Sequence, residues 1–213
     1  MMEHFLYIAS GIWVTLLYTI CSLIIGFIWG LILSLLEECP FKFLKKCIRG
    51  YLVFFRGTPL LLQLTLVYFV YPSITGHQIS AFSAGIIAFS LNSAAYISEI
   101  LRGGLASVDR AQREAAHTLG IPYFLSMRDI VLPQALRVSA PGLMNESISL
   151  LKETALISIL GEADIMRRAQ LVAAETYSYF EPLFIAAGCY LFLTWSLSKL
   201  GPLMERRFFH DNA

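Results

Sequence analysis

An uncharged, strongly apolar run from Phe5 to Leu36 is the feature that most limits how this chain can fold. A helix needs about 20 mostly apolar residues to cross the hydrocarbon core of a bilayer, and this run is longer. It also exceeds the roughly 7–15 apolar residues of a cleavable signal peptide. The residues before it, Met1 to His4, include no lysine or arginine. We therefore expect a retained membrane-spanning helix in this part of the chain.

Four further segments are long and mainly apolar, so the sequence predicts an all-α membrane protein with five spans. Hydrophobic residues make up 57% of the chain and charged residues 15%, a balance typical of integral membrane proteins. We expect one transmembrane domain over residues 1–213, with a polar loop from Glu37 to Arg49 and a cytosolic loop over 102–132. The expected spans are about 8–36, 57–76, 78–101, 133–160 and 182–200.

The distribution of lysine and arginine predicts the orientation of these spans. All but three of the 16 Lys and Arg residues follow the first span, surround the 102–132 loop or follow the fifth span. The exceptions are Lys152, Arg167 and Arg168. Because cytoplasmic segments carry the excess of positive residues, we expect the N-terminus outside the cell and the C-terminus in the cytosol. The same rule places the 102–132 loop in the cytosol.

The 102–132 loop contains a short amphipathic segment that begins near Gln112. Asp109 can cap the amino end of a helix there, and Gly120 can end it in a left-handed conformation. One narrow apolar stripe, made mostly of small residues, comprises Val108, Ala111, Ala115 and Leu119. Two interpretations follow: a helix that lies on the membrane surface, or a helix that docks on a partner protein.

The spacing through this loop resembles the EAA signature of ABC-importer permeases. The residues that carry the resemblance are Glu114-Ala115-Ala116, Gly120, Ile130 and Leu132-Pro133. In that family the loop forms the cytoplasmic coupling helices, which sit in a groove of the ATP-hydrolysing subunit. The resemblance therefore implies an ATPase-coupling role for Glu114, Ala115, Ala116, Gly120 and Pro133.

The fourth predicted span is the least lipid-like, because it carries Glu146, Lys152 and Glu153. Each charge at a bilayer centre costs about 2.5–3.5 kcal/mol, whereas each Leu or Ile returns only about 0.3–0.6 kcal/mol. We therefore expect this helix to face protein or a water-filled cavity. Glu146, Ser149 and Glu153 share one helical face and are candidates for a substrate path that receives a cationic group. The alternative is that the charges lie near the outer mouth, compensated by neighbouring helices or by snorkelling to water.

The third predicted span shows a milder version of the same pattern. Asn92 is a further candidate for the substrate path. The alternative for Asn92 and Ser93 is helix-to-helix hydrogen bonding, the commoner fate of such residues. We expect Glu99 to pair with Arg102, three residues further on, near the cytosolic interface.

Three more segments resemble one branch of the same family, the polar amino-acid uptake permeases. They are FRGTPLLLQL (55–64), NSAAYISEILRGGL (92–105) and LPQALRVSAPGLMNESISLLKETALIS (132–158). The resemblance implies the five-helix fold of type I importer permeases in the bacterial cytoplasmic (inner) membrane. It implies a dimer with a second copy or a paralogue, two ATPase subunits and an extracytoplasmic substrate-binding protein. It also implies substrate contacts at Glu146, Ser149 and Glu153.

A polar amino acid is the cargo that this resemblance implies, and Glu146 favours arginine, lysine or histidine, with glutamine as the other candidate.

The chain lacks a GxxxxGK[ST] phosphate loop, so we expect ATP and Mg²⁺ on the partner ATPase and no cofactor in this chain. No catalytic or metal-binding residues are expected, because no HExxH motif is present and no histidine falls in a predicted span. Nucleic acid is not an expected partner. An ATP-independent secondary transporter or channel for a small polar solute is the alternative, but it leaves the EAA-like loop without a purpose.

Overall fold

The computed structural model describes the backbone of residues 2–209 and the side chains of residues 2–200. Residues 1 and 210–213 of the predicted domain lie outside the described residues. Every regular element within the described range is a helix, which confirms the all-α class. In chain order the elements are α1 (Met2–Ala9), α2 (Ile12–Glu38), α3 (Lys42–Gly57), α4 (Leu60–Thr65), the π-helical η1 (Leu66–Val70), α5 (Tyr71–Thr75), α6 (Ala81–Ser107), α7 (Arg110–Thr118), α8 (Tyr123–Ser126), the π-helical η2 (Met127–Val131), α9 (Leu132–Glu153), the 3₁₀-helical η3 (Thr154–Leu160), α10 (Ile165–Thr176) and α11 (Phe180–Phe209).

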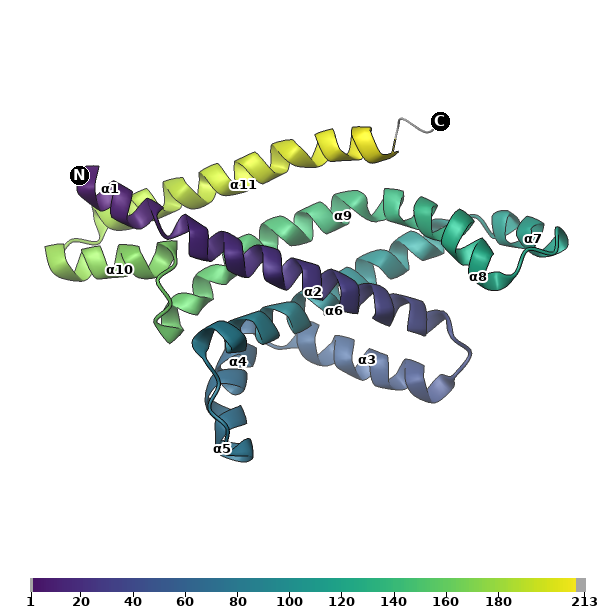
Figure 1. The fold of residues 1–213 in the computed structure, drawn as a ribbon, viewed down its shortest axis with the longest axis horizontal. Helices are drawn as coiled ribbons and strands as arrows, with labels where there is room; N and C mark the ends of the chain where they lie inside the picture. Colours follow the sequence, from purple (N-terminus) through teal and green to yellow (C-terminus); the bar gives the residue numbers. More distant parts are fainter. Residues whose placement is uncertain (1, 210–213) are drawn as a thin grey trace.

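Helix α6 lies at the centre of the structure, packed between α2 and α9 (Figure 1). Small residues allow these backbones to approach closely. A Cβ added at Gly30 of α2 would lie 2.9 Å from the carbonyl oxygen of Ala94. A Cβ at Gly104 of α6 would lie 2.5 Å from that of Ala135 in α9. Small residues at helix contacts are the usual means of close packing in membranes, where lipid removes the hydrophobic drive for association.

Three described stretches are long and apolar enough to cross a membrane. They are residues 2–38, which comprise α1 and α2; helix α6; and residues 180–200 of α11. A fourth is formed if α3 and the α4–α5 segment count as one broken span, with a bend of 105° between its arms. Helix α3 covers part of the segment for which the sequence predicted a polar loop. The bend falls at Thr58 and Pro59, because proline offers no backbone N–H and holds the preceding residue extended.

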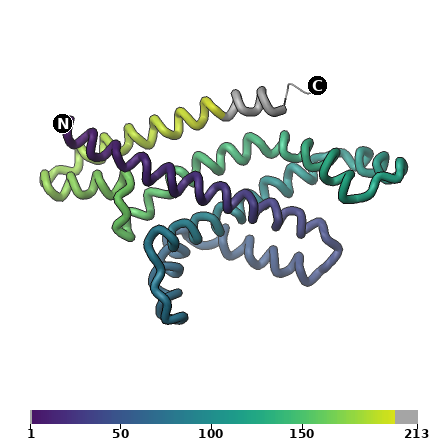
Figure 2. The backbone as a smooth tube through the Cα atoms, viewed as in Figure 1, coloured from purple at the N-terminus to yellow at the C-terminus, as the bar shows by residue number. Residues whose placement is uncertain are grey.

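The predicted fourth span, 133–160, is divided between α9 and the tighter helix η3, which ends at Gly161 in a left-handed conformation. Helix α10 then occupies the segment between the last two predicted spans. Different helices form the two ends of the molecule. Figure 2 shows α1, α10 and the start of α11 gathered at one end, whereas α7 and α8 project from the other.

Candidate functional site

Glu146 in α9 contacts α6 through a single polar bond. Its Oε1 accepts a hydrogen bond of 2.7 Å from the hydroxyl of Ser93, which is fully buried. This is the helix-to-helix hydrogen bond that was the alternative for Ser93. A carboxylate can accept about four hydrogen bonds, and a partly buried one is costly unless it is paired. Glu146 therefore retains acceptor capacity between the two central helices.

Ser149 and Glu153 lie along the same face of α9 as Glu146. The helix is continuous from Leu132 to Glu153, so the spacing read from the sequence is preserved and the two carboxylates are about 10 Å apart along the axis. Both Ser149 and Glu153 are half-buried. Neither makes a side-chain hydrogen bond or ion pair with the described residues. The face thus offers polar groups that the fold itself leaves unpaired.

Asn92 has a different position. Its amide nitrogen donates to the carbonyl oxygen of Phe55 and to Oε1 of Gln63, both at 3.0 Å. The Gln63 amide in turn donates to the carbonyl oxygens of Phe55 at 2.9 Å and Thr58 at 3.1 Å. Asn92 therefore supports the break between α3 and α4 and makes no hydrogen bond to Glu146 in this structure. These contacts are of the helix-to-helix kind that was the alternative for Asn92.

The predicted short helix in the 102–132 loop is α7. Asp109 caps it, accepting a 3.0 Å hydrogen bond from the backbone N–H of Ala111. Gly120 follows with φ of +73°, the left-handed conformation expected of it. No atom would meet a Cβ at Gly120 within 4 Å, so the residue is required there by its backbone conformation and not by lack of space.

Most of the residues predicted to couple this loop to a partner face outward. Glu114, Ala115, Gly120 and Pro133 are exposed, whereas Ala116 is buried. Three members of the apolar stripe are exposed: Ala111, Ala115 and Leu119, the last with 77% of its surface accessible. Only Val108 is buried. An apolar stripe presented to the exterior at one end of the fold fits either interpretation of this helix, a docking contact with a partner protein or a contact with the membrane surface.

One arginine, not singled out by the sequence, fixes α7 to the long helices. The guanidinium of Arg113 donates to Oε2 of Glu38 at 3.2 Å and to the carbonyl oxygen of Leu105 at 2.9 Å. Glu38 ends α2, and Leu105 lies in the last turns of α6. No local pattern in the sequence could have revealed this link, because the pairing depends on how α2 and α6 pack.

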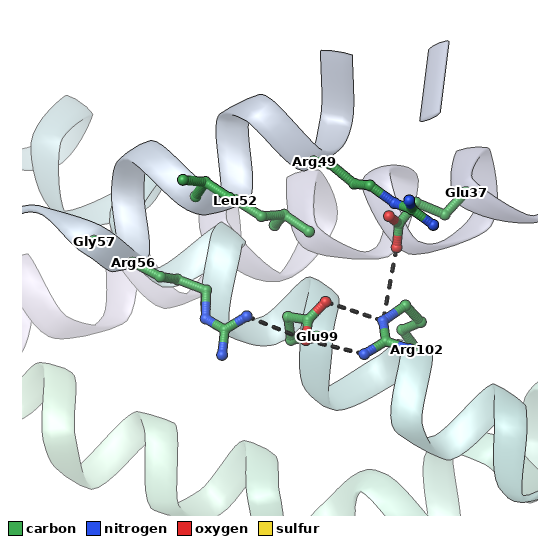
Figure 3. A pocket seen from close by; sticks show the side chains of 8 residues that line it. Glu37, Arg49, Leu52, Arg56, Gly57, Glu99 and Arg102 are labelled. Atoms are coloured by element: carbon green, nitrogen blue, oxygen red, sulfur yellow. Dashed lines mark hydrogen bonds and ion pairs between the residues drawn. The ribbon is translucent and has the colours of Figure 1, made fainter. Parts of the chain in front are cut away.

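A second polar cluster lies where α2, α3 and α6 meet (Figure 3). Glu99 accepts from Arg102 at 2.9 and 3.0 Å, which confirms the predicted pair. The structure adds Arg56 at 3.1 Å from Glu99 and Glu37 at 3.9 Å from Arg102. These side chains, together with Arg49, Leu52, Val53 and Gly57, line a pocket of about 570 Å³.

Comparison with known proteins gives one consistent result. The sequence profile described as "Binding-protein-dependent transport system inner membrane component" matches residues 22–210. A Rickettsia felis protein, provisionally named the glutamine transport system permease protein GlnP, is 48% identical over 202 residues, covering 95% of this chain and 93% of that protein. The arginine transport system permease protein ArtQ of Bacillus subtilis is 45% identical over 201 residues, covering 94% and 92%. A solved structure titled an amino acid ABC transporter with histidines superposes with a TM-score of 0.89 at 40% identity, covering 97% of this chain and 96% of that one.

Proposed function

Since the chain belongs to the family of binding-protein-dependent transport system inner membrane components, we propose that it forms the translocation path of an importer for a basic amino acid. It has the fold of a type I ABC-importer permease and is a transport subunit, not an enzyme. Glutamine is the second candidate cargo, favoured by the name of the Rickettsia felis relative.

The carboxylate of Glu146 is the observation that carries the choice of a basic cargo. It has one described donor, Ser93, and lies between the two central helices with further acceptor capacity. A guanidinium, ammonium or imidazolium group would supply both the charge and the donors that this site lacks. Ser149 and Glu153 extend the polar face along α9. The relative named for arginine and the solved structure titled with histidines support the same class.

The path is formed in the bacterial cytoplasmic membrane by two permeases, either two copies of this chain or this chain and a paralogue. Each contributes five spans, with the N-terminus outside and the C-terminus in the cytosol. The asymmetric distribution of lysine and arginine supports this orientation. The broken pair α3 and α4–α5 provides the second span. Helix α9 with η3 provides the fourth, whose charges face protein instead of lipid.

A separate ATPase supplies the energy and holds ATP and Mg²⁺; the lack of a GxxxxGK[ST] phosphate loop in this sequence supports this division of roles. Helix α7 is the docking element, with Glu114 and Ala115 on its exposed side and Gly120 exposed in the turn that follows it. Ala116 packs inward and Pro133 starts the helix that leads to Glu146. An extracytoplasmic binding protein delivers the cargo on the opposite side.

Uptake into proteoliposomes tests this proposal. The permease is purified with its co-expressed ATPase and reconstituted with ATP or without it inside the vesicles. Uptake of labelled arginine, lysine, histidine and glutamine is measured with the cognate binding protein added outside. We expect ATP-dependent uptake of a basic amino acid, which Glu146→Gln weakens more than it weakens uptake of glutamine. Glu175→Gln, an exposed carboxylate in α10, is the matched control. Uptake without ATP would favour a secondary transporter, and equal losses for basic and neutral cargo would exclude charge recognition by Glu146.

A further inference from the structure

Helix α3 carries five cations on one face, and the transport proposal gives them no role. At 100° per residue, these side chains fall within an arc of about 100°. They are Lys42, Lys45, Lys46, Arg49 and Arg56. The adjoining face is apolar and holds the helix in place, because Ile48 and Leu52 are buried against Leu33 of α2 and Ala95 of α6. Lys42, Lys46 and Arg49 are therefore exposed beside that core, whereas Arg56 near the end of the helix pairs with Glu99 of α6.

Two residues of this basic face, Arg49 and Arg56, line the pocket between α2, α3 and α6 (Figure 3). Two carboxylates are present there, Glu99 and Glu37, and two arginines balance their charge. Arg56 and Arg102 both pair with Glu99, and Arg102 also lies 3.9 Å from Glu37. Arg49 is the remaining cation of the pocket. It is exposed and makes no ion pair with any described side chain. The pocket thus carries surplus positive charge at Arg49.

Lys46 lies one turn before Arg49 and extends that positive charge beyond the pocket. It is also exposed and without an ion pair among the described residues. Apolar side chains adjoin the same surface. Val53 lines the pocket and is 74% exposed, and Phe54 beside it is 47% exposed. Surplus positive charge next to exposed apolar side chains is complementary to an anionic group that carries a hydrocarbon chain.

We propose that the pocket between α2, α3 and α6 binds the headgroup phosphate of an anionic phospholipid. Arg49 is the principal contact, because a guanidinium matches the geometry of a phosphate and holds its charge at any relevant pH. Lys45 and Lys46 add attraction along the basic face, and Val53 and Phe54 contact the acyl chains. Basic pockets between membrane helices are a known type of site for anionic headgroups. The inference requires only that α3 lies at a bilayer, so it is independent of the cargo.

Native mass spectrometry of the purified full-length chain in detergent tests the proposal. The chain is titrated with phosphatidylglycerol and, separately, with phosphatidylcholine of the same acyl chains. We expect tighter binding of phosphatidylglycerol, and a loss of about 30-fold in that affinity in Lys46→Gln/Arg49→Gln. Arg110→Gln/Arg137→Gln is the matched control, since it removes two other exposed cations without ion pairs among the described residues. Arg49→Lys, which keeps the charge but not the planar guanidinium, should weaken the binding less than the double variant does.

Three outcomes would overturn the assignment. Equal binding of both lipids would show that the phosphate charge is not recognised. An equal loss in the control variant would show diffuse attraction to the whole protein instead of a site at Arg49. Millimolar inorganic phosphate that binds the wild type with the same dependence on Lys46 and Arg49 would make the ligand free phosphate instead of a lipid.

Discussion

Arg113 of α7 lies 3.2 Å from Glu38 at the end of α2, although 75 residues separate them in the sequence. The same guanidinium holds the carbonyl oxygen of Leu105 in α6. One side chain therefore ties the proposed docking helix to two of the long helices. A displacement of α7 by a partner would be transmitted to both of them through this contact.

Loss of the Arg113 contact should uncouple transport more than it destabilises the fold. Both partners are 32% exposed, and an ion pair of this kind contributes at most about 1 kcal/mol. We expect Arg113→Gln to lower the amount of cargo transported per ATP hydrolysed, with the thermal midpoint nearly unchanged. Arg110→Gln, one turn earlier and unpaired among the described residues, is the control. The charge swap Arg113→Glu/Glu38→Arg should recover part of the coupling; no recovery would argue against the ion pair as the relevant contact.

Gly120 should tolerate asparagine but not valine. Its φ of +73° costs about 1–2 kcal/mol for most L-residues, is worst for β-branched ones, and is adopted readily by asparagine. We expect Gly120→Val to lose most ATP-driven uptake while inserting normally into the membrane, and Gly120→Asn to retain it. Uptake and membrane abundance are measured together. Gly188→Val, at an open position in α11, controls for added bulk. Equal activity of the two Gly120 variants would mean that the left-handed turn does not set the position of α7.

Removing the Ser93 hydroxyl should destabilise the protein through Glu146. The carboxylate would lose its described donor inside the helix bundle, at a cost of about 1–3 kcal/mol. We expect Ser93→Ala to lower the thermal midpoint in detergent. Ser90→Ala should be neutral or stabilising, because the Ser90 hydroxyl is buried on the same helix without a described partner. In the Glu146→Gln background the effect of Ser93→Ala should shrink; strictly additive effects of the two substitutions would contradict the pairing.

Asp164 predicts a pH dependence of stability. It is fully buried at the start of α10, where it accepts hydrogen bonds from the Arg167 backbone N–H at 2.8 Å and the Tyr190 hydroxyl at 3.1 Å. Burial raises the pKa of this carboxyl to about 6, from an ordinary value of 3.8, despite those hydrogen bonds. Because the folded state binds this proton more tightly than the unfolded state, the free energy of unfolding falls as pH rises from about 4 to about 6.

The contribution of Asp164 is about 3 kcal/mol across that range, and it is absent in Asp164→Asn, which keeps a capping side chain. We therefore expect the wild type to have a higher thermal midpoint in detergent at pH 5 than at pH 7.5, and this difference to shrink in Asp164→Asn. Asp129, an exposed aspartate whose pKa is lowered by its hydrogen bond to Arg128, is the control position. An unchanged pH profile in Asp164→Asn would assign the dependence to other groups.

Local features of this chain were predictable from sequence, whereas contacts between distant segments were not. The cap at Asp109, the turn at Gly120 and the pair Glu99–Arg102 each depend on residues a few positions apart, and all three are present. Helix α3 was predicted as loop up to Arg49, because its lysines masked an apolar face that is recognisable only once α2 and α6 provide its partner surface. Arg113–Glu38 depends on the same tertiary packing.

The amides of Asn92 and Gln63 have a mechanical consequence for the bend between α3 and α4. They occupy the carbonyl oxygens of Phe55 and Thr58 that the interrupted helix leaves without partners. A change of the angle at this bend would break these hydrogen bonds and leave the two carbonyl oxygens without their present donors. We therefore expect α3 and α4 to keep their relative angle and to move together with α6, which carries Asn92.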